Sequence, residues 1–234
     1  MGFKGHRYLG DPINAVKIFN DLKADELVFL DISATIENRL ISLDFVRDVG
    51  DEANMPFAVG GGIKSIQDIR DILNAGAEKV VINSAAFIQP DFIRLASDTF
   101  GSSTIVVCID VKKQFFGKEQ SWILNGNKST GLTPIELAER MEKAGAGEII
   151  IQSIERDGMM QGYDIRLIKK ISESVTIPVI ALGGAGNGEH MKQAYSLGNA
   201  NALAAGSMFV YHGARKGILI NYPDKTELNK LFSE

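Results

Sequence analysis

The chain has 234 residues, of which 45% are apolar, 24 are glycine, 25 are basic and 29 are acidic, giving a net charge of −4. This balance is ordinary for a folded globular protein and excludes a disordered tail. The mild acidity, without any cluster of Lys and Arg, argues against nucleic acid or an anionic membrane as a partner. No run approaches the ~20 apolar residues of a membrane span, and the N-terminus lacks a secretory pattern, so we expect a cytoplasmic protein.

Short apolar runs alternate with helix-patterned stretches along the chain. This alternation predicts βα units around a parallel sheet. Capping residues support several helix starts, since Asp11 precedes Pro12, Pro90 precedes Asp91, and the segment 133–136 reads Thr-Pro-Ile-Glu. The seven predicted strands are 27–30, 57–59, 80–82, 105–109, 149–151, 179–181 and 202–205, and the helical segments include 11–23, 65–75, 90–100, 133–144, 163–174 and 189–197.

Residues 112–130 break this rhythm and predict a β-hairpin inserted after the fourth strand. In this interpretation 114–118 and 121–124 flank a short turn, and Trp122 packs rather than stacking on a ligand. The single cysteine, Cys108, lies inside the fourth apolar run, so it cannot form an intrachain disulfide and is expected to be a buried core residue.

The two halves of the chain resemble each other. The segment 59–62, Val-Gly-Gly-Gly, recurs as Leu-Gly-Gly-Ala at 182–185, a spacing of 123 residues (183 − 60), and the segment 25–31 recurs at 146–152. The matched spacing predicts a duplicated half-barrel, and therefore an α/β fold of the (β/α)₈ TIM-barrel type, which typically has about 250 residues.

The same spacing places the partner of the strand ending at Asp110 before residue 1 (110 − 122 = −12). We therefore expect the first β-strand to be missing and Met1 to lie in the first βα connection. A seven-stranded parallel barrel has two unpaired edges, which is a stability hazard. Residues 1–234 are accordingly expected to form a single (β/α)₈-type barrel domain that is truncated at its N-terminus.

The carboxyl ends of the predicted strands are rich in residues that suit phosphate. In a (β/α)₈ barrel, ligands bind at these ends, and glycine there exposes backbone N–H donors. Either glycine-rich turn alone could equally be a tight βα loop, but their repetition in both halves favours phosphate binding. The first predicted set is Gly61, Gly62, Asn83 and Ser84, and the second is Gly184, Gly206 and Ser207, aided by Gly158.

Asp110 is the best candidate for general acid or base chemistry. It ends an apolar strand, where an ionised carboxylate is costly unless it is paired or used. Asp31 ends the first predicted strand, and for it a structural role in capping the next loop and a catalytic role are equally open. Gln152 is a possible pocket residue, as is Asp157, which follows Arg156 and could simply be ion-paired.

The three histidines lack the spacing of metal ligands, so neither a metal nor another cofactor is expected. At the opposite ends of the strands, Glu26, Lys79 and Glu148 each precede an apolar run and place charge around the bottom mouth of the barrel. A solvated rim is the simplest interpretation of these three residues.

Several ordered motifs identify a resemblance that runs from Gly10 to about Ala205. They include 25–32, 59–63, 79–86, 109–110, 145–149, 156–164 and 183–186, and they resemble the cyclase subunit of imidazole glycerol phosphate synthase, HisF. The resemblance implies a barrel that forms a heterodimer with a HisH-type glutaminase and receives ammonia at its bottom face. That ammonia converts a bis-phosphorylated aminoimidazole-carboxamide ribonucleotide to imidazole glycerol phosphate and AICAR, in histidine biosynthesis.

The resemblance also implies residue roles. Aspartates on the first and fifth strands of the family act as acid and base, and Asp110 matches the fifth-strand one. Glu26, Lys79 and Glu148 match the family's ammonia gate, whereas the first-strand aspartate and the gate's arginine are absent from this sequence.

Other positions depart from the family. Gln152 stands where the family has Thr, Glu155 where it has Asp, and Leu182 where it has a substrate-binding Ser. Replacing a hydroxyl by Leu removes a hydrogen-bond donor and adds apolar bulk at the mouth. These departures, with the tail after Ala205, favour an alternative: a non-cyclising HisF-like paralogue that channels ammonia to an amidotransferase in surface-polysaccharide sugar amidation.

Overall fold

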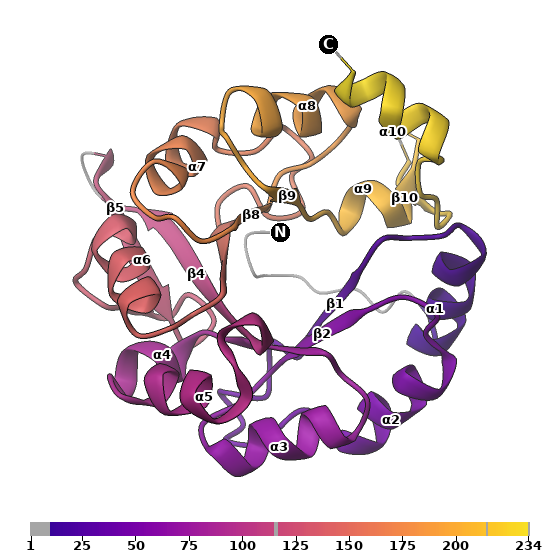
Figure 1. Ribbon diagram of the computed structural model, residues 1–234. Coiled ribbons are helices and arrows are strands. Elements are labelled where there is room, and N and C mark those ends of the chain that lie inside the picture. The colour runs from indigo at the N-terminus through magenta and orange to yellow at the C-terminus, as the bar shows by residue number, and fades with distance from the viewer. Residues whose placement is uncertain (1–9, 115–116, 214, 234) are drawn as a thin grey trace.

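The computed structural model describes residues 10–114, 117–213 and 215–233, and its parallel strands curl around a central axis inside a ring of helices (Figure 1). The parallel strands pair in the order β1-β2-β3-β4-β7-β8-β9. This architecture confirms the TIM-barrel-like α/β fold and all seven predicted strands. Their bounds are Leu27–Leu30 for β1, Phe57–Gly60 for β2, Lys79–Ile82 for β3, Ile105–Lys113 for β4, Glu148–Ser153 for β7, Val179–Leu182 for β8 and Ala202–Leu203 for β9.

The sheet ends at β1 on one side and at β9 on the other. Within the described ranges, no strand pairs with the outer edge of either one. The predicted position of Met1 in the first βα connection falls outside the described residues, and the strand expected before residue 1 stays a prediction.

The helices follow the strands as expected, and their starts show which capping predictions were right. The Asp11 side chain accepts the Ile13 N–H, and Thr133 forms a capping box with Glu136. Asp91 was wrongly predicted to cap its helix: its backbone is helical (φ −90°, ψ −5°) rather than extended, and its side chain caps no N–H. The helices are α1 Pro12–Asp21, α2 Leu43–Glu52, α3 Ile66–Asn74, α4 Ser84–Ile88, α5 Phe92–Phe100, α6 Pro134–Lys143, α7 Ile165–Ser172, α8 Gly188–Ser196, α9 Ser207–Val210 and α10 Lys225–Phe232.

The predicted hairpin is present, but its arms differ from the prediction. Strand β4 itself continues as the first arm and pairs antiparallel with β5 (Glu119–Ile123), which then pairs with β6 (Lys128–Ser129). Leu124 begins the second turn instead of ending a strand, because it and Asn125 adopt positive φ values of 54° and 56°. Phe115 and Phe116, within the predicted first arm, lie outside the described residues. A second small sheet joins β10 (Tyr211–His212) to β11 (Gly217–Ile218).

Side-chain alternation on the strands separates two apolar clusters. On β4, Ile105, Val107 and Ile109 belong to the large cluster that includes helix residues, whereas Val106 and Cys108 belong to a small cluster with residues of β2, β3 and β7. Because successive side chains on a strand point to opposite faces, the small cluster occupies the barrel interior. The prediction that Cys108 is buried is confirmed. Asp110 follows Cys108 on the same inner face.

Candidate functional site

The inner face of the barrel changes character along its axis. Charged side chains lie at the starts of β3 and β7, small and aliphatic side chains fill the middle, and polar side chains lie near the ends of β4 and β7. This layering places a charged cluster and a polar pocket at opposite ends of one apolar interior. From start to end, the inner residues are Lys79 and Val81 on β3, Val106, Cys108 and Asp110 on β4, and Glu148, Ile150 and Gln152 on β7.

The charged cluster at the strand starts is held together by Lys79. Its ammonium lies 2.9 Å from Glu148 Oε1 and 3.3 Å from Glu26 Oε2. Burial alone would lower the pKa of Lys79, but the two carboxylates raise it above its ordinary value. The sequence placed these residues at one mouth of the barrel, and the structure joins them in a single ion-paired cluster instead of a rim of separate solvated charges.

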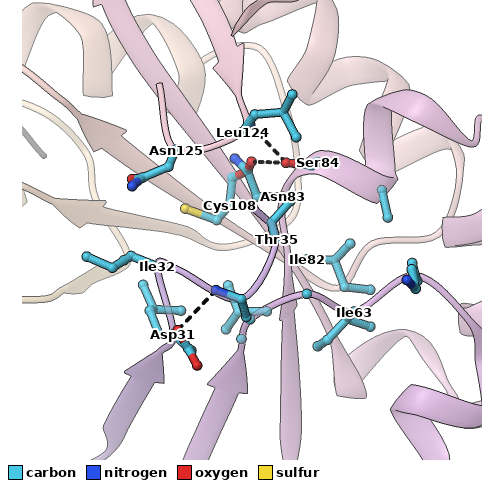
Figure 2. Close-up of a pocket in the computed structure, with 18 of the residues that line it drawn as sticks. Asp31, Ile32, Thr35, Ile63, Ile82, Asn83, Ser84, Cys108, Leu124 and Asn125 are labelled. Carbon is cyan, nitrogen blue, oxygen red and sulfur yellow. Dashed lines mark hydrogen bonds between the residues drawn. The ribbon is translucent and has the colours of Figure 1, made fainter. Parts of the chain in front are cut away.

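A cavity of about 340 Å³ opens at the other end of the strands (Figure 2). The turn between β5 and β6 contributes Leu124 and Asn125 to its wall. The cavity brings together the first predicted phosphate set and three of the predicted acid, base and pocket residues, although their binding and catalytic roles stay predictions. The predicted residues that line it are Asp31, Gly61, Gly62, Asn83, Ser84, Asp110 and Gln152.

Hydrogen bonds fix Asn83 and Ser84 in this wall. Asn83 Nδ2 donates to the Cys108 carbonyl at 3.0 Å, and Ser84 Oγ donates to Asn83 Oδ1 at 3.0 Å. The Leu124 N–H donates to Ser84 Oγ at 3.0 Å, a contact visible in Figure 2. The inserted hairpin is therefore anchored to the first predicted phosphate set.

The glycines of this set are required by close packing. Gly62 has φ +70°, and a Cβ there would lie 1.8 Å from the Arg39 carbonyl oxygen. A Cβ on Gly61 would lie 2.7 Å from the Asp31 Cβ. The tight-loop explanation left open by the sequence therefore accounts for both glycines, and phosphate binding by their N–H groups stays a prediction.

Asp31 has a structural role in the loop after β1. Its Oδ1 accepts the N–H groups of Ser33 at 3.0 Å and Ala34 at 3.1 Å, and its Oδ2 forms an ion pair with Arg39. Of the two roles that the sequence left equal, capping is the one that these contacts support. The sequence did not indicate Arg39, because it lies eight positions after Asp31 along an irregular loop.

Asp110 is the unusual carboxyl group of the pocket. It is only 6% exposed, and within the described part of the chain it has no salt-bridge partner. Burial raises its pKa, the hydrogen bond from the Cys108 thiol lowers it, and the negative charge of Asp157 raises it, with a net value of about 7. The carboxyl group is therefore able to hold or release a proton near neutral pH.

The second predicted phosphate set lies apart from this pocket. None of Gly158, Gly184, Gly206 and Ser207 is among the residues that line it. Gly184 is again required by packing, because a Cβ there would lie 2.3 Å from the Gly162 carbonyl oxygen. Its phosphate-binding role stays a prediction.

Asp164 is a buried carboxyl group that the sequence did not indicate as a site residue. Its Oδ2 lies 3.1 Å from Lys113 Nζ and 3.9 Å from Arg156 Nε, and its Oδ1 accepts the Leu167 N–H. Burial alone would raise the pKa of Asp164, but these partners lower it below its ordinary value. Its position at the second residue of the helix-patterned segment 163–174 was the available signal, because aspartate at the start of a helix commonly caps it.

Two features are absent from the part of the chain that the structure describes. No group of three or more His, Cys, Asp and Glu side chains is arranged to hold a metal ion. No helix in the described ranges is both long and apolar enough to span a membrane.

Comparison with known proteins places the chain in a family. The family model described as histidine biosynthesis protein matches residues 2–215. A Pseudomonas aeruginosa protein with the provisional name imidazole glycerol phosphate synthase subunit hisF2 is 41% identical over 227 residues, covering 97% of this chain and 90% of the relative. A Leptospira interrogans protein, provisionally named as subunit HisF of the same synthase, is 40% identical over 98% of this chain and 91% of its own length.

A third relative is named without reservation as imidazole glycerol phosphate synthase subunit HisF. This protein, from Alkaliphilus metalliredigens, is 43% identical over 203 residues, which cover 87% of this chain and 81% of the relative. The long matches, the family model and the TIM-barrel-like architecture agree. The chain therefore belongs to the histidine biosynthesis protein family, as a member of its HisF group.

Proposed function

We propose that this chain is a single-domain cyclase subunit of imidazole glycerol phosphate synthase, with Asp110 as a general acid or base. The observation that carries the proposal is the buried Asp110 carboxyl, with a pKa raised to about 7, inside a cavity of about 340 Å³. A group whose pKa lies near the working pH is best suited to proton transfer. The HisF names of the relatives support the same activity.

The proposed substrate is a bis-phosphorylated aminoimidazole-carboxamide ribonucleotide. One phosphate would contact the first set, where Asn83 and Ser84 line the pocket. The other would contact the second set, Gly158, Gly184, Gly206 and Ser207. The ring and ribose oxygens would then lie near Asp110, which supplies or removes protons as the imidazole ring closes and AICAR leaves.

We propose that ammonia reaches the pocket through the barrel interior. The cluster of Glu26, Lys79 and Glu148 stands at the strand starts, and Asp110 stands at the strand ends of the same inner face. Between them lie apolar side chains, including Val106 and Ile150, which cannot hydrogen-bond to ammonia and retain it. A HisH-type glutaminase would dock at the face that carries the charged cluster and supply the ammonia.

Turnover with free ammonium tests this activity without the partner. The full-length protein should release AICAR from the bis-phosphorylated substrate. Asp110→Asn should lower kcat by roughly 10²- to 10⁴-fold, the usual contribution of a general acid or base. Asp44→Asn is the matched control, because the Asp44 side chain is 89% exposed on α2 and is not among the residues that line the pocket. An Asp110→Asn rate equal to that of the Asp44→Asn control would contradict the proposal.

One observation favours a second candidate function, a conduit that passes ammonia to a separate amidotransferase. Leu182 pairs with Gln152 between β8 and β7 and packs against the interior cluster, so it adds apolar bulk at a strand end. A chain that stimulates a glutaminase but releases no AICAR even at saturating ammonium would support the conduit. If that outcome is observed, the Leu182→Ser variant should be tested for recovery of AICAR release.

A further inference from the structure

The Cys108 thiol lies between two buried oxygen atoms of the pocket. Its Sγ is 3.7 Å from Asp110 Oδ1 and 3.8 Å from Gln152 Oε1. Asp110 and Gln152 are paired across β4 and β7, and all three side chains are buried and line the cavity. The three therefore form one contact group on two neighbouring strands.

A thiol carries a single proton, so it can donate only one full hydrogen bond at a time. Burial raises the pKa of the Cys108 thiol well above its ordinary value, and the proton therefore stays on sulfur. The two acceptors lie at nearly equal distances, so distance does not decide between them. The choice depends on which oxygen is the stronger acceptor.

The protonation of Asp110 changes that choice. An ionised carboxylate accepts roughly twice as strongly as a neutral group, so it takes the thiol proton whenever Asp110 is charged. Once Asp110 is protonated, its carboxyl is a neutral and weaker acceptor, and the amide oxygen of Gln152 competes. The thiol thus has two hydrogen-bonded states that follow the charge on its neighbour.

We propose that Cys108 is a positioning residue: its thiol donates to Asp110 when that carboxyl is ionised and to Gln152 when it is protonated, so that the charge of Asp110 sets the orientation of the Gln152 amide. Gln152 Nε2 makes no hydrogen bond within the described part of the chain, and Gln152 lines the cavity. With Oε1 held by the thiol, the amide N–H groups are free to donate to an oxygen of the ligand. The part of this inference in which the Gln152 amide donates to a ligand rests on the proposed function.

Other titratable and charged groups face Asp110 or the cavity from the neighbouring elements. Asp157, from the loop after β7, raises its pKa, and β3 contributes the neutral Asn83. On the hairpin side, Trp122 pairs with Asp110 in the ladder, and Lys112 stacks over the indole ring at 5.0 Å. The loops after β1 and β2 bring further charges to the cavity wall: Asp31, Arg39 and Lys64.

Infrared spectroscopy of the S–H stretch tests the proposal, because the full chain contains one cysteine and therefore one such band. The S–H band falls in frequency as its hydrogen bond strengthens. From about pH 5 to about pH 9 the wild-type band should move to lower frequency, with a midpoint near 7, the pKa of Asp110. Asp110→Asn should abolish the movement, and Asp44→Asn should leave it unchanged.

A Gln152→Leu variant separates the two hydrogen-bonded states. Because it removes only the second acceptor, its band should match that of the wild type at high pH and move to the position of a free thiol at low pH. A wild-type band that stays fixed across this pH range would overturn the proposal, as would a shift that persists in Asp110→Asn. The measurement needs no turnover. A protein that shows the band shift but fails to release AICAR would therefore contradict the proposed cyclase activity and leave the proposed role of the thiol standing.

Discussion

Asp110, on the inner face near the end of β4, and Asp164, in the loop before α7, have similar solvent exposure, yet their pKa values are shifted in opposite directions. Asp110 is 6% exposed and has its pKa raised to about 7, whereas Asp164 is 7% exposed and has its pKa lowered. The difference lies in their neighbours. Lys113, Arg156 and a backbone N–H surround the carboxylate of Asp164, whereas Asp110 accepts its side-chain hydrogen bond from a thiol.

The comparison indicates that a buried carboxyl group holds its proton near neutral pH where its charge is incompletely compensated. Asp164 is satisfied in its charged form, because it caps α7 and ties that helix to the end of β4 through Lys113. Asp110 is left with a charge that the protein stabilises poorly, and such groups concentrate at active sites. Asp164 is therefore an anchor of the fold, and Asp110 is the candidate for proton transfer.

The largest expected effect is on the pH dependence of stability at Asp110. The pKa of Asp110 in the folded protein, about 7, exceeds the ~3.9 of an unfolded aspartate, so the folded state binds the proton more tightly. Wild-type stability should therefore fall as the pH rises between these values. Asp110→Asn cannot ionise, and its free energy of unfolding relative to wild type should increase by about 3 kcal/mol between about pH 5 and about pH 8.

Urea unfolding of both proteins at the two pH values measures this change. Subtracting the two curves cancels the groups that titrate identically in both proteins. A difference that stays constant with pH would show that the Asp110 carboxyl has the same pKa folded and unfolded, which would remove the contrast with Asp164.

Asp164→Asn should show the opposite dependence, with a smaller magnitude. A carboxyl whose folded pKa is depressed stabilises the protein above its unfolded pKa and loses that contribution as the pH falls through the folded value. Removing the charge should cost roughly 2 kcal/mol near pH 7, discounted from the cost of breaking a fully buried pair because the Lys113 side chain is 35% exposed. The penalty should shrink below about pH 4 in chemical unfolding. If Asp164→Asn lowers the free energy of unfolding by the same amount near pH 7 and below about pH 4, the ion pair contributes nothing to stability.

Lys79→Met tests a third arrangement, in which one ammonium serves two carboxylates at the strand starts. The variant leaves Glu26 and Glu148 without their shared partner, and their mutual repulsion should lower stability by about 1 kcal/mol, because the cluster is partly exposed and screened. Ammonium-driven AICAR release should be unchanged, whereas glutamine-driven release with a HisH-type partner should fall. Equal losses in the two assays would argue against a role for Lys79 in ammonia passage.

Strand positions and the location of Asp110 followed from the sequence, because buried parallel strands are near-continuous apolar runs and a carboxylate at the end of one stands out. Helices α2 and α10 were not among the predicted segments, although Ser42 and Asp224 cap them. A short helix of mixed polarity gives a weaker hydrophobic pattern in the sequence than a buried strand does.

The contacts of the site were less predictable. Asp31 and Asp110 looked alike as strand-end carboxylates, and only the fold shows that Arg39 neutralises one and not the other. Long-range partners such as Lys113 for Asp164 are 51 residues apart and leave no local pattern. The repeated glycines predicted two equivalent phosphate sites, but close packing against Arg39 and Gly162 explains the requirement for glycine in both turns.

Carboxyl-carbon NMR of the full chain labelled at aspartate tests the contrast most directly. Asp110→Asn and Asp164→Asn assign the two resonances by their disappearance. The Asp110 signal should titrate with a midpoint near 7, while the Asp164 signal should remain that of a carboxylate at pH values where exposed aspartates have already protonated. Titration of both signals together, near the ~3.9 of an ordinary aspartate, would contradict the central claim that Asp110 is the proton-transfer group of this barrel.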